Sequence, residues 1–210
     1  MASFRRFFSD AFGVLAETID DYGAFNICLL SDLPLFIDPF LLFQSEKPEY
    51  QRLHSEIIAY LRFLLTKSQA GVLDSGRMKE WLYFKEVKQN WLGSTFLGNE
   101  GHGLGAKFAV ALNGNLARGL ETSGTEPHLE KVGLLTGKVG LDGISDFTTN
   151  LIKHWLLTYT QAFAQQHVDP ALCRNFTVPR AQFDYENEVW SYGRYLLPEH
   201  DGDFVILEGY

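Results

Sequence analysis

Cysteine is scarce in this chain, with two residues, Cys28 and Cys173, among 210. They lie far apart and form no Cys-x-x-Cys pair, which fits a reducing compartment better than a disulfide framework. The chain also lacks a run of about 18 apolar residues, the length that a membrane-spanning helix needs. Its N-terminus carries no apolar stretch typical of a secretion signal. We therefore expect a cytoplasmic protein that does not associate with membranes.

Basic residues are in the minority. Lysine and arginine number 18 against 26 acidic residues, and the formal net charge is −8. This balance opposes the broad electropositive surface that non-specific nucleic-acid binding requires, so a nucleic acid could bind only through a local basic site. The hydrophobic content of 46% and the aromatic content of 14% are sufficient for a packed core. Because there is no internal repeat or low-complexity linker, we expect a single domain over residues 1–210.

Hydrophobic spacing predicts a largely helical first part of the chain. Apolar residues recur at helical intervals over residues 49–66, 78–91 and 145–166. From about residue 175 the composition changes to aromatic and β-branched residues, which favours strands. The expected fold is α+β, with a mainly helical body over residues 1–170 and a strand-rich extension over residues 171–210.

A glycine-framed loop over residues 137–144 leads into the third predicted helix and carries Asp142. Ser145 is suited to cap this helix by accepting a hydrogen bond from the Thr148 backbone amide. Asp146 would then lie in the first turn, where the helix dipole favours negative charge. Capping alone accounts for both residues without assigning them a function.

The same helix start also permits a functional interpretation. Asp146, Thr149, Asn150 and Lys153 share one helix face beside the loop residue Asp142. Such a polar row could bind a hard cation or orient a phosphate, because oxygen ligands suit Mg²⁺. The structural alternative is an ordinary solvated helix face, and the sequence leaves both interpretations open.

A Glu-x-Lys element at Glu86 and Lys88 matches a short motif of metal-dependent nucleases, in which the carboxylate holds the metal and the lysine steadies the attacking water. That motif belongs on a strand, whereas the spacing here predicts a helix, on which the two side chains would point to different faces. If a hydrolytic site exists, its predicted catalytic residues are Glu86, Lys88, Asp142 and Asp146. The predicted ligands for Mg²⁺ or Mn²⁺ are Asp38, Asp142 and Asp146.

Glycines cluster upstream of Lys107 and invite a nucleotide-binding interpretation. The run ends in Ala106-Lys107-Phe108, which lacks the Gly-Lys-Ser/Thr ending of a P-loop and excludes that motif. Backbone amides of a loop that opens onto a helix could still hold an anion. The predicted anion loop consists of Gly101, Gly103 and Gly105. No histidine pair has the spacing of a zinc site, and no Gly-x-Ser-x-Gly element is present.

Four segments, in this order, resemble those of a family of long, largely uncharacterised bacterial proteins. They are the Ile-Asp-Pro segment within residues 32–39, the Phe-x-Glu-Val segment at 84–87, the glycine loop ending at Gly105, and Gly-x-Asp-x-Ile-Ser-Asp at 140–146. The resemblance spans most of the chain and implies an association with mobile or defence-related gene sets, without an established activity. The chain departs from the family at Lys85, where proline is commoner. It also ends near residue 210, where relatives continue, so the resemblance implies a C-terminally shortened chain.

Two functions of different classes are consistent with these features, and whether the protein is an enzyme stays open. The first is a nuclease-like, metal-dependent phosphodiester hydrolase that acts in phage defence. The second is a non-catalytic binding or scaffold module of a larger assembly. Residues 183–210 carry seven acidic side chains and one arginine, Arg194, among several aromatic residues, and would form the surface for a protein partner. The acids in glycine-framed loops favour the first function, whereas the lack of a complete catalytic motif favours the second.

Overall fold

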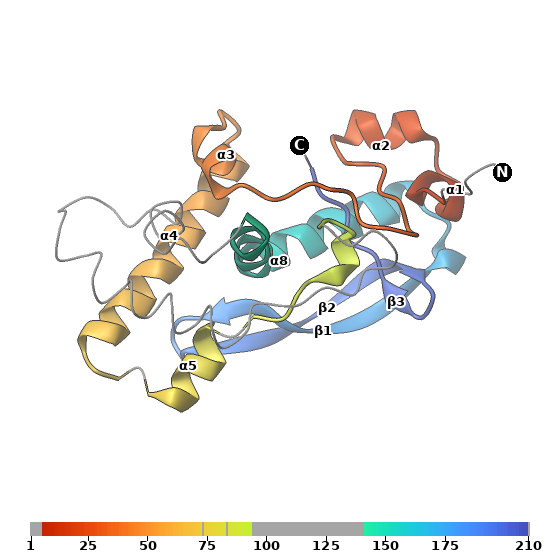
Figure 1. The fold of residues 1–210 in the computed structure, drawn as a ribbon. Coiled ribbons are helices and arrows are strands. Elements are labelled where there is room, and N and C mark those ends of the chain that lie inside the picture. Colours follow the sequence, from red (N-terminus) through yellow and green to blue (C-terminus); the bar gives the residue numbers. More distant parts are fainter. Residues whose placement is uncertain (1–5, 73, 83, 94–140, 210) are drawn as a thin grey trace.

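The computed structural model describes residues 6–72, 74–82, 84–93 and 141–209 (Figure 1). Helices are the main elements of the N-terminal part, and a three-stranded antiparallel sheet of order β1-β2-β3 lies near the C-terminus, which confirms the predicted α+β fold. No helix within the described ranges is both long enough and apolar enough to cross a membrane. The elements are α1 (Phe8–Phe12), α2 (Ala16–Tyr22), α3 (Pro39–Gln44), α4 (Pro48–Gln69), α5 (Ser75–Leu82), η1 (Lys88–Asn90), α8 (Leu141–His167), η2 (Pro170–Leu172), β1 (Cys173–Asp184), β2 (Val189–His200) and β3 (Asp203–Phe204).

Helix α8 is the central element of the described structure. It contacts β1 and β2 as well as α3 and α4, and Figure 1 shows it between the hairpin and the α3–α4 pair. Phe147, Leu156 and Phe163 recur along α8 at helical spacing and are buried. The helix predicted over residues 145–166 is therefore confirmed, and it begins four residues earlier, at Leu141.

Strands β1 and β2 form a long antiparallel hairpin that covers one side of α8. Their pairing runs from Cys173 opposite Pro198 to Asp184 opposite Val189. The register shifts between Val178 and Gln182, where Arg180 adopts a positive φ of 52°. Such a bulge increases the local twist and lets the hairpin curve over the helix.

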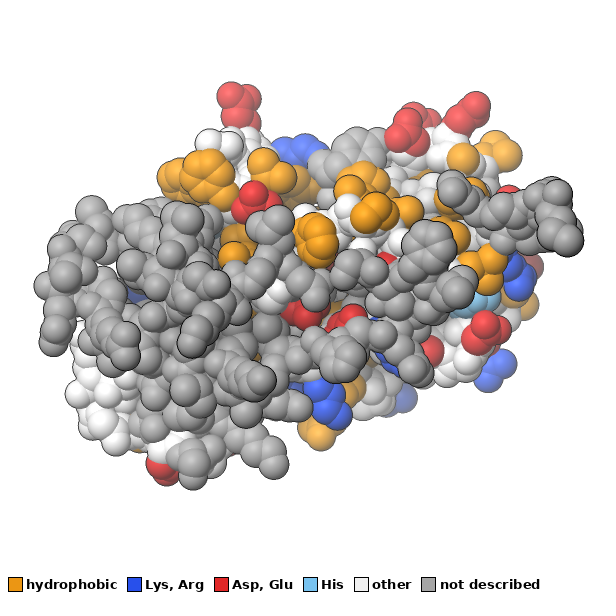
Figure 2. Space-filling model, in the orientation of Figure 1, with side chains coloured by type: hydrophobic (Ala, Val, Ile, Leu, Met, Phe, Trp, Pro, Cys, Tyr) orange, Lys and Arg blue, Asp and Glu red, His pale blue; other side chains and the backbone are white. Residues whose placement is uncertain are grey.

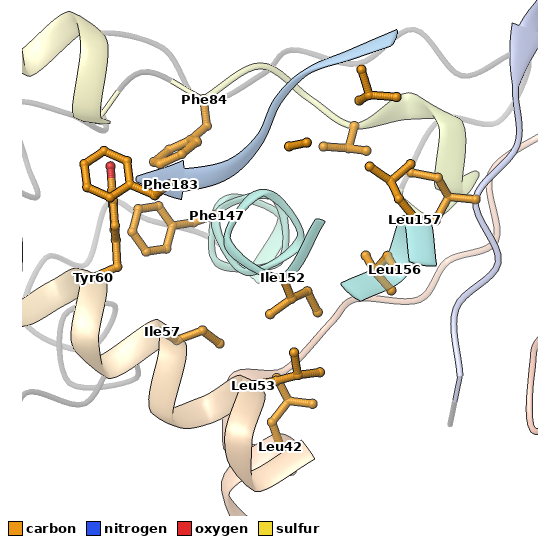
Figure 3. Close-up of a cluster of buried hydrophobic side chains, with 14 of the residues drawn as sticks. Leu42, Leu53, Ile57, Tyr60, Phe84, Phe147, Ile152, Leu156, Leu157 and Phe183 are labelled. Atoms are coloured by element: carbon orange, nitrogen blue, oxygen red, sulfur yellow. The ribbon is translucent and has the colours of Figure 1, made fainter. Parts of the chain in front are cut away.

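Buried side chains form two clusters, and α8 contributes to both. In the larger cluster, aromatic rings of α4, α8 and β1 meet Phe84 (Figure 3). The Phe84 and Phe147 rings are perpendicular with centroids 5.0 Å apart, and Tyr60 meets Phe183 at the same distance. The smaller cluster packs α1 and α2 against the C-terminal half of α8. The assignment of the whole chain to one domain stays a prediction.

The C-terminal segment, residues 205–209, crosses α8 and is held on both sides. The Leu207 backbone N–H donates to Thr160 Oγ1 of α8 over 2.9 Å. The Phe25 N–H donates to the Glu208 carbonyl oxygen over 3.0 Å. These bonds fix the direction of the Glu208 side chain because its backbone is tied to two separate parts of the fold.

Two local predictions are wrong, and a tertiary hydrogen bond accounts for each. The helix expected over residues 78–91 ends at Leu82. Beyond this end, the Lys85 carbonyl oxygen accepts a hydrogen bond from Asn150 Nδ2 of α8 over 2.9 Å, in place of the helical bond that the prediction required. Ser145 lies inside α8 instead of capping it, and its Oγ accepts from the Ile37 N–H over 2.9 Å.

Candidate functional site

A cavity of about 540 Å³ lies between α3, α4, α8 and the C-terminal segment. This volume is within the range of small-molecule sites, which are commonly apolar and carry a few polar groups. The walls are mostly apolar, and Figure 2 shows hydrophobic side chains gathered over α3 and the segment that leads into it. The apolar lining includes Phe25, Leu35, Phe36, Ile37, Leu41, Leu42, Leu53, Leu92, Ile152, Trp155 and Leu156.

Glu208 is the buried carboxyl group of this cavity. Its residue is 3% exposed, and its Oε1 accepts from Asn90 Nδ2 over 2.8 Å. Burial raises the pKa of Glu208 to about 8, and the Asn90 hydrogen bond offsets part of that rise. A buried carboxyl with a raised pKa in a concave site is a recognised mark of binding and catalytic sites.

The backbone around Glu208 leaves no room for a side chain at the next position. A Cβ on Gly209 would lie 2.8 Å from Tyr50 Oη and 3.0 Å from the Gly23 carbonyl oxygen. On the other side, Asn90 ends the short turn η1, and Trp91 follows it with a left-handed φ of 54°. The glycine and this turn together bring the carboxyl and the amide into contact.

Within the described residues, three titratable side chains besides Glu208 line the cavity: Asp38, Lys47 and Tyr50. Asp38 is the N-cap of α3 and accepts from the Phe40 N–H over 2.9 Å, with Pro39 in the first helical position. Lys47 Nζ lies 4.9 Å from the centroid of the Tyr50 ring, within the range of a cation–π contact.

The structure brings several segments with predicted site residues onto the first turns of α8. The Ile37–Ser145 hydrogen bond places the segment containing Asp38 against this helix. The Asn150–Lys85 hydrogen bond does the same for the segment containing Glu86.

The predicted metal and anion sites themselves stay predictions. Asp146 is partly buried, whereas Lys88 and Asp38 are exposed. The side chain of Asp142 and the predicted anion loop of Gly101, Gly103 and Gly105 lie outside the described residues. Among the side chains that are described, no three His, Cys, Asp or Glu residues are grouped as a metal site would require.

Three residues of the polar row of α8 are buried and do not form the solvated face of the structural alternative. Thr149, Asn150 and Lys153 are 1%, 3% and 7% exposed. Lys153 Nζ donates to Asn150 Oδ1 over 3.2 Å. Burial lowers the pKa of Lys153 to about 8, and the nearby Arg180 guanidinium lowers it further in the same direction. The row therefore holds α8 to its neighbours instead of facing water.

Sequence reasoning missed Glu208 and Asn90 as a pair. A signal was present, because Glu208 directly follows the apolar run Phe204–Leu207, where an acid within a buried strand-like segment is unusual. The partner could not be found in this way, since Asn90 is separated from Glu208 by 118 positions.

These features define an α+β protein whose helices and C-terminal segment line a mostly apolar cavity that includes the buried acid Glu208. The chain belongs to the family described as a domain of unknown function (DUF8370), which matches residues 13–208. This match agrees with the resemblance to an uncharacterised family. No curated protein and no solved structure matches the chain.

Proposed function

We propose that the protein is a non-catalytic binding module that holds a small, largely apolar organic molecule in the cavity between α3, α4 and α8. The observation that carries this proposal is the combination of a ligand-sized volume, about 540 Å³, with mostly apolar walls and a buried acid. Water held against mostly apolar walls finds few hydrogen-bond partners, so a bound apolar molecule that displaces it is favoured.

The expected affinity is weak. Burying about 200 Å² of apolar ligand surface contributes about 5 kcal/mol, before the cost of lost ligand motion is subtracted. Net dissociation constants of about 1 mM or weaker are therefore expected for simple aromatic compounds. The helices that form the walls also belong to the packed core, so the site needs little ordering when the ligand enters.

The test uses the environment-sensitive dye N-phenylnaphthylamine and a variant that fills the cavity. Leu42 lines the cavity from the short helix α3, so Leu42→Trp should weaken dye binding at least about tenfold. Leu15→Trp is the matched control, because Leu15 is 71% exposed and does not belong to the cavity lining. Circular dichroism should show that both variants keep their fold. Equal dye binding by the wild type and Leu42→Trp would contradict the proposal.

A second candidate is the metal-dependent phosphodiester hydrolase predicted from the sequence. It is supported by the two hydrogen bonds that bring the segments containing Asp38 and Glu86 to α8, near Asp142 and Asp146. Its test is a titration of thermal stability with Mg²⁺ and Mn²⁺ on the wild type and on Asp146→Ala, alongside hydrolysis of bis-nitrophenyl phosphate. Metal-dependent stabilisation that is lost in the variant would support a hydrolase, and none in the wild type would exclude it.

The resemblance connects this second candidate to phage defence in bacteria. Plaque counts on cells that express the wild type or Asp146→Ala would test that role. Equal protection by both proteins would show that protection against phage does not require the proposed metal ligand Asp146.

A further inference from the structure

The Glu208 carboxyl uses one of its two oxygens in the hydrogen bond with Asn90. Asn90 Oδ1 accepts from the Leu92 N–H over 3.2 Å, which turns the Asn90 NH₂ group toward Glu208 Oε1. Because an amide NH₂ only donates, Oε1 must be the accepting oxygen. Within the described residues, Oε2 has no hydrogen-bond partner, although the side chain lines the cavity.

The surroundings of Glu208 favour the neutral acid. Among the described residues, the titratable groups that line the cavity or lie beside Gly209 are Asp38 before α3, Lys47 and Tyr50 at the start of α4, and Tyr159 of α8. Among the described side chains, none of these forms an ion pair with Glu208. Burial without a counter-ion raises the pKa of Glu208 to about 8, so the carboxyl keeps its proton at neutral pH. Since Oε1 accepts from Asn90, Oε2 is the oxygen available to carry the proton in a side chain that lines the cavity.

On this geometry, which rests on the proposed binding function, we propose that the cavity selects an uncharged apolar molecule bearing a carbonyl-type oxygen that accepts a hydrogen bond from Glu208. A ketone, ester or amide oxygen meets this requirement. A hydrocarbon of the same shape would leave the acid hydrogen without an acceptor, which disfavours it about tenfold. An ammonium group would have to lose its own water and ionise the acid, and buried ion pairs regain that cost only with excellent geometry.

The experiment compares three compounds of similar size by isothermal titration and by displacement of N-phenylnaphthylamine. Acetophenone carries the carbonyl oxygen, ethylbenzene lacks it, and benzylamine is cationic. We expect the wild type to bind acetophenone about tenfold more tightly than ethylbenzene. That preference should be constant from about pH 5 to pH 7 and should decline as pH rises through about 8, where Glu208 is half ionised.

Two variants at position 208 separate a hydrogen-bond donor from a charge. Glu208→Gln keeps the acceptor for Asn90 and a donor toward the cavity but cannot ionise, so it should prefer acetophenone at every pH. Glu208→Leu removes the donor and should abolish the preference. Glu17→Gln is the matched control, because Glu17 is exposed in the first turn of α2 and should reproduce the wild-type pH profile. The wild-type pH profile remains decisive if Glu208→Leu does not fold.

The outcomes distinguish this inference from the proposed function. If neither the dye nor any of the three compounds binds, both are overturned. If the dye and ethylbenzene bind but acetophenone has no advantage, only the selectivity for a carbonyl oxygen is overturned. A preference for benzylamine that is lost in Glu208→Gln would identify an ionised carboxylate and would also overturn the inference.

Discussion

Replacing the buried acid Glu208 with glutamine should stabilise the protein at neutral pH. In the folded chain burial raises the pKa of Glu208 from an ordinary value of 4.5 to about 8. Below pH 4.5 both the folded and the unfolded chain hold the proton, so the acid carries no penalty. As pH rises from 4.5 to 8, the unfolded chain releases its proton while the folded chain keeps it, and folding becomes less favourable.

The size of this effect follows from the raised pKa. Each pH unit between the two values costs about 1.4 kcal/mol of folding free energy, which gives about 3 kcal/mol at pH 7. Glutamine avoids this cost because it does not ionise, and its amide oxygen can still accept from Asn90 Nδ2. The Glu208→Gln variant should therefore match the wild type near pH 4.5 and exceed its unfolding free energy by about 3 kcal/mol at pH 7.

The assay is urea denaturation of the wild type and Glu208→Gln at several pH values from about 4.5 to 8. The quantity of interest is the difference in unfolding free energy, which cancels contributions from other titrating groups. Glu17→Gln, at an exposed site, should show a difference near zero throughout. A difference for Glu208→Gln that stays constant with pH would contradict this prediction, because it would mean that burial does not hold the proton on Glu208.

The remaining predictions concern stability and use the same denaturation assay. Lys153→Met should be more stable than the wild type by about 2 kcal/mol below pH 8, where the folded wild type must hold a buried protonated lysine. This gain should shrink as pH rises from about 8 to 10.5, because the folded wild type loses that proton first. A gain that grows with pH would contradict this prediction. Gly209→Ala should lose about 2 kcal/mol or more, because its Cβ would lie 2.8 Å from Tyr50 Oη; unchanged stability would show that the segment moves away without cost. Ser145→Ala should lose about 1–2 kcal/mol by leaving the Ile37 N–H without its acceptor, and equal stability of the variant and the wild type would count against that hydrogen bond.

Much of the secondary structure was predictable because its signals are local. The helices predicted over residues 49–66 and 145–166 appear as α4 and α8, since apolar residues at three- and four-residue spacing need a partner surface wherever the chain folds. The change to aromatic and β-branched residues after residue 175 marks β1 and β2. Local signals failed at Lys85 and Ser145, where a side chain or an amide from a distant segment decides the hydrogen bond.

The candidate site was only partly predictable. Asp38 was selected as a metal ligand, and the structure places it in the lining of the cavity, where it caps α3. Glu208 was counted among the acids of a partner surface, yet it is buried. Charge and residue type indicate where acids are frequent along the chain. They do not indicate which acid becomes buried and loses its hydration when the chain folds.

The α+β class, the long central helix and the strand-rich end follow from hydrophobic periodicity, which acts over a few turns or strands. The cavity and the protonation of its acid depend on contacts between distant segments. Asn90 and Glu208 meet across 118 positions, and the burial that holds the proton on Glu208 is supplied by segments far from it in the sequence. A pKa depends on the solvent and dipoles around a group, and these exist only after the chain has folded.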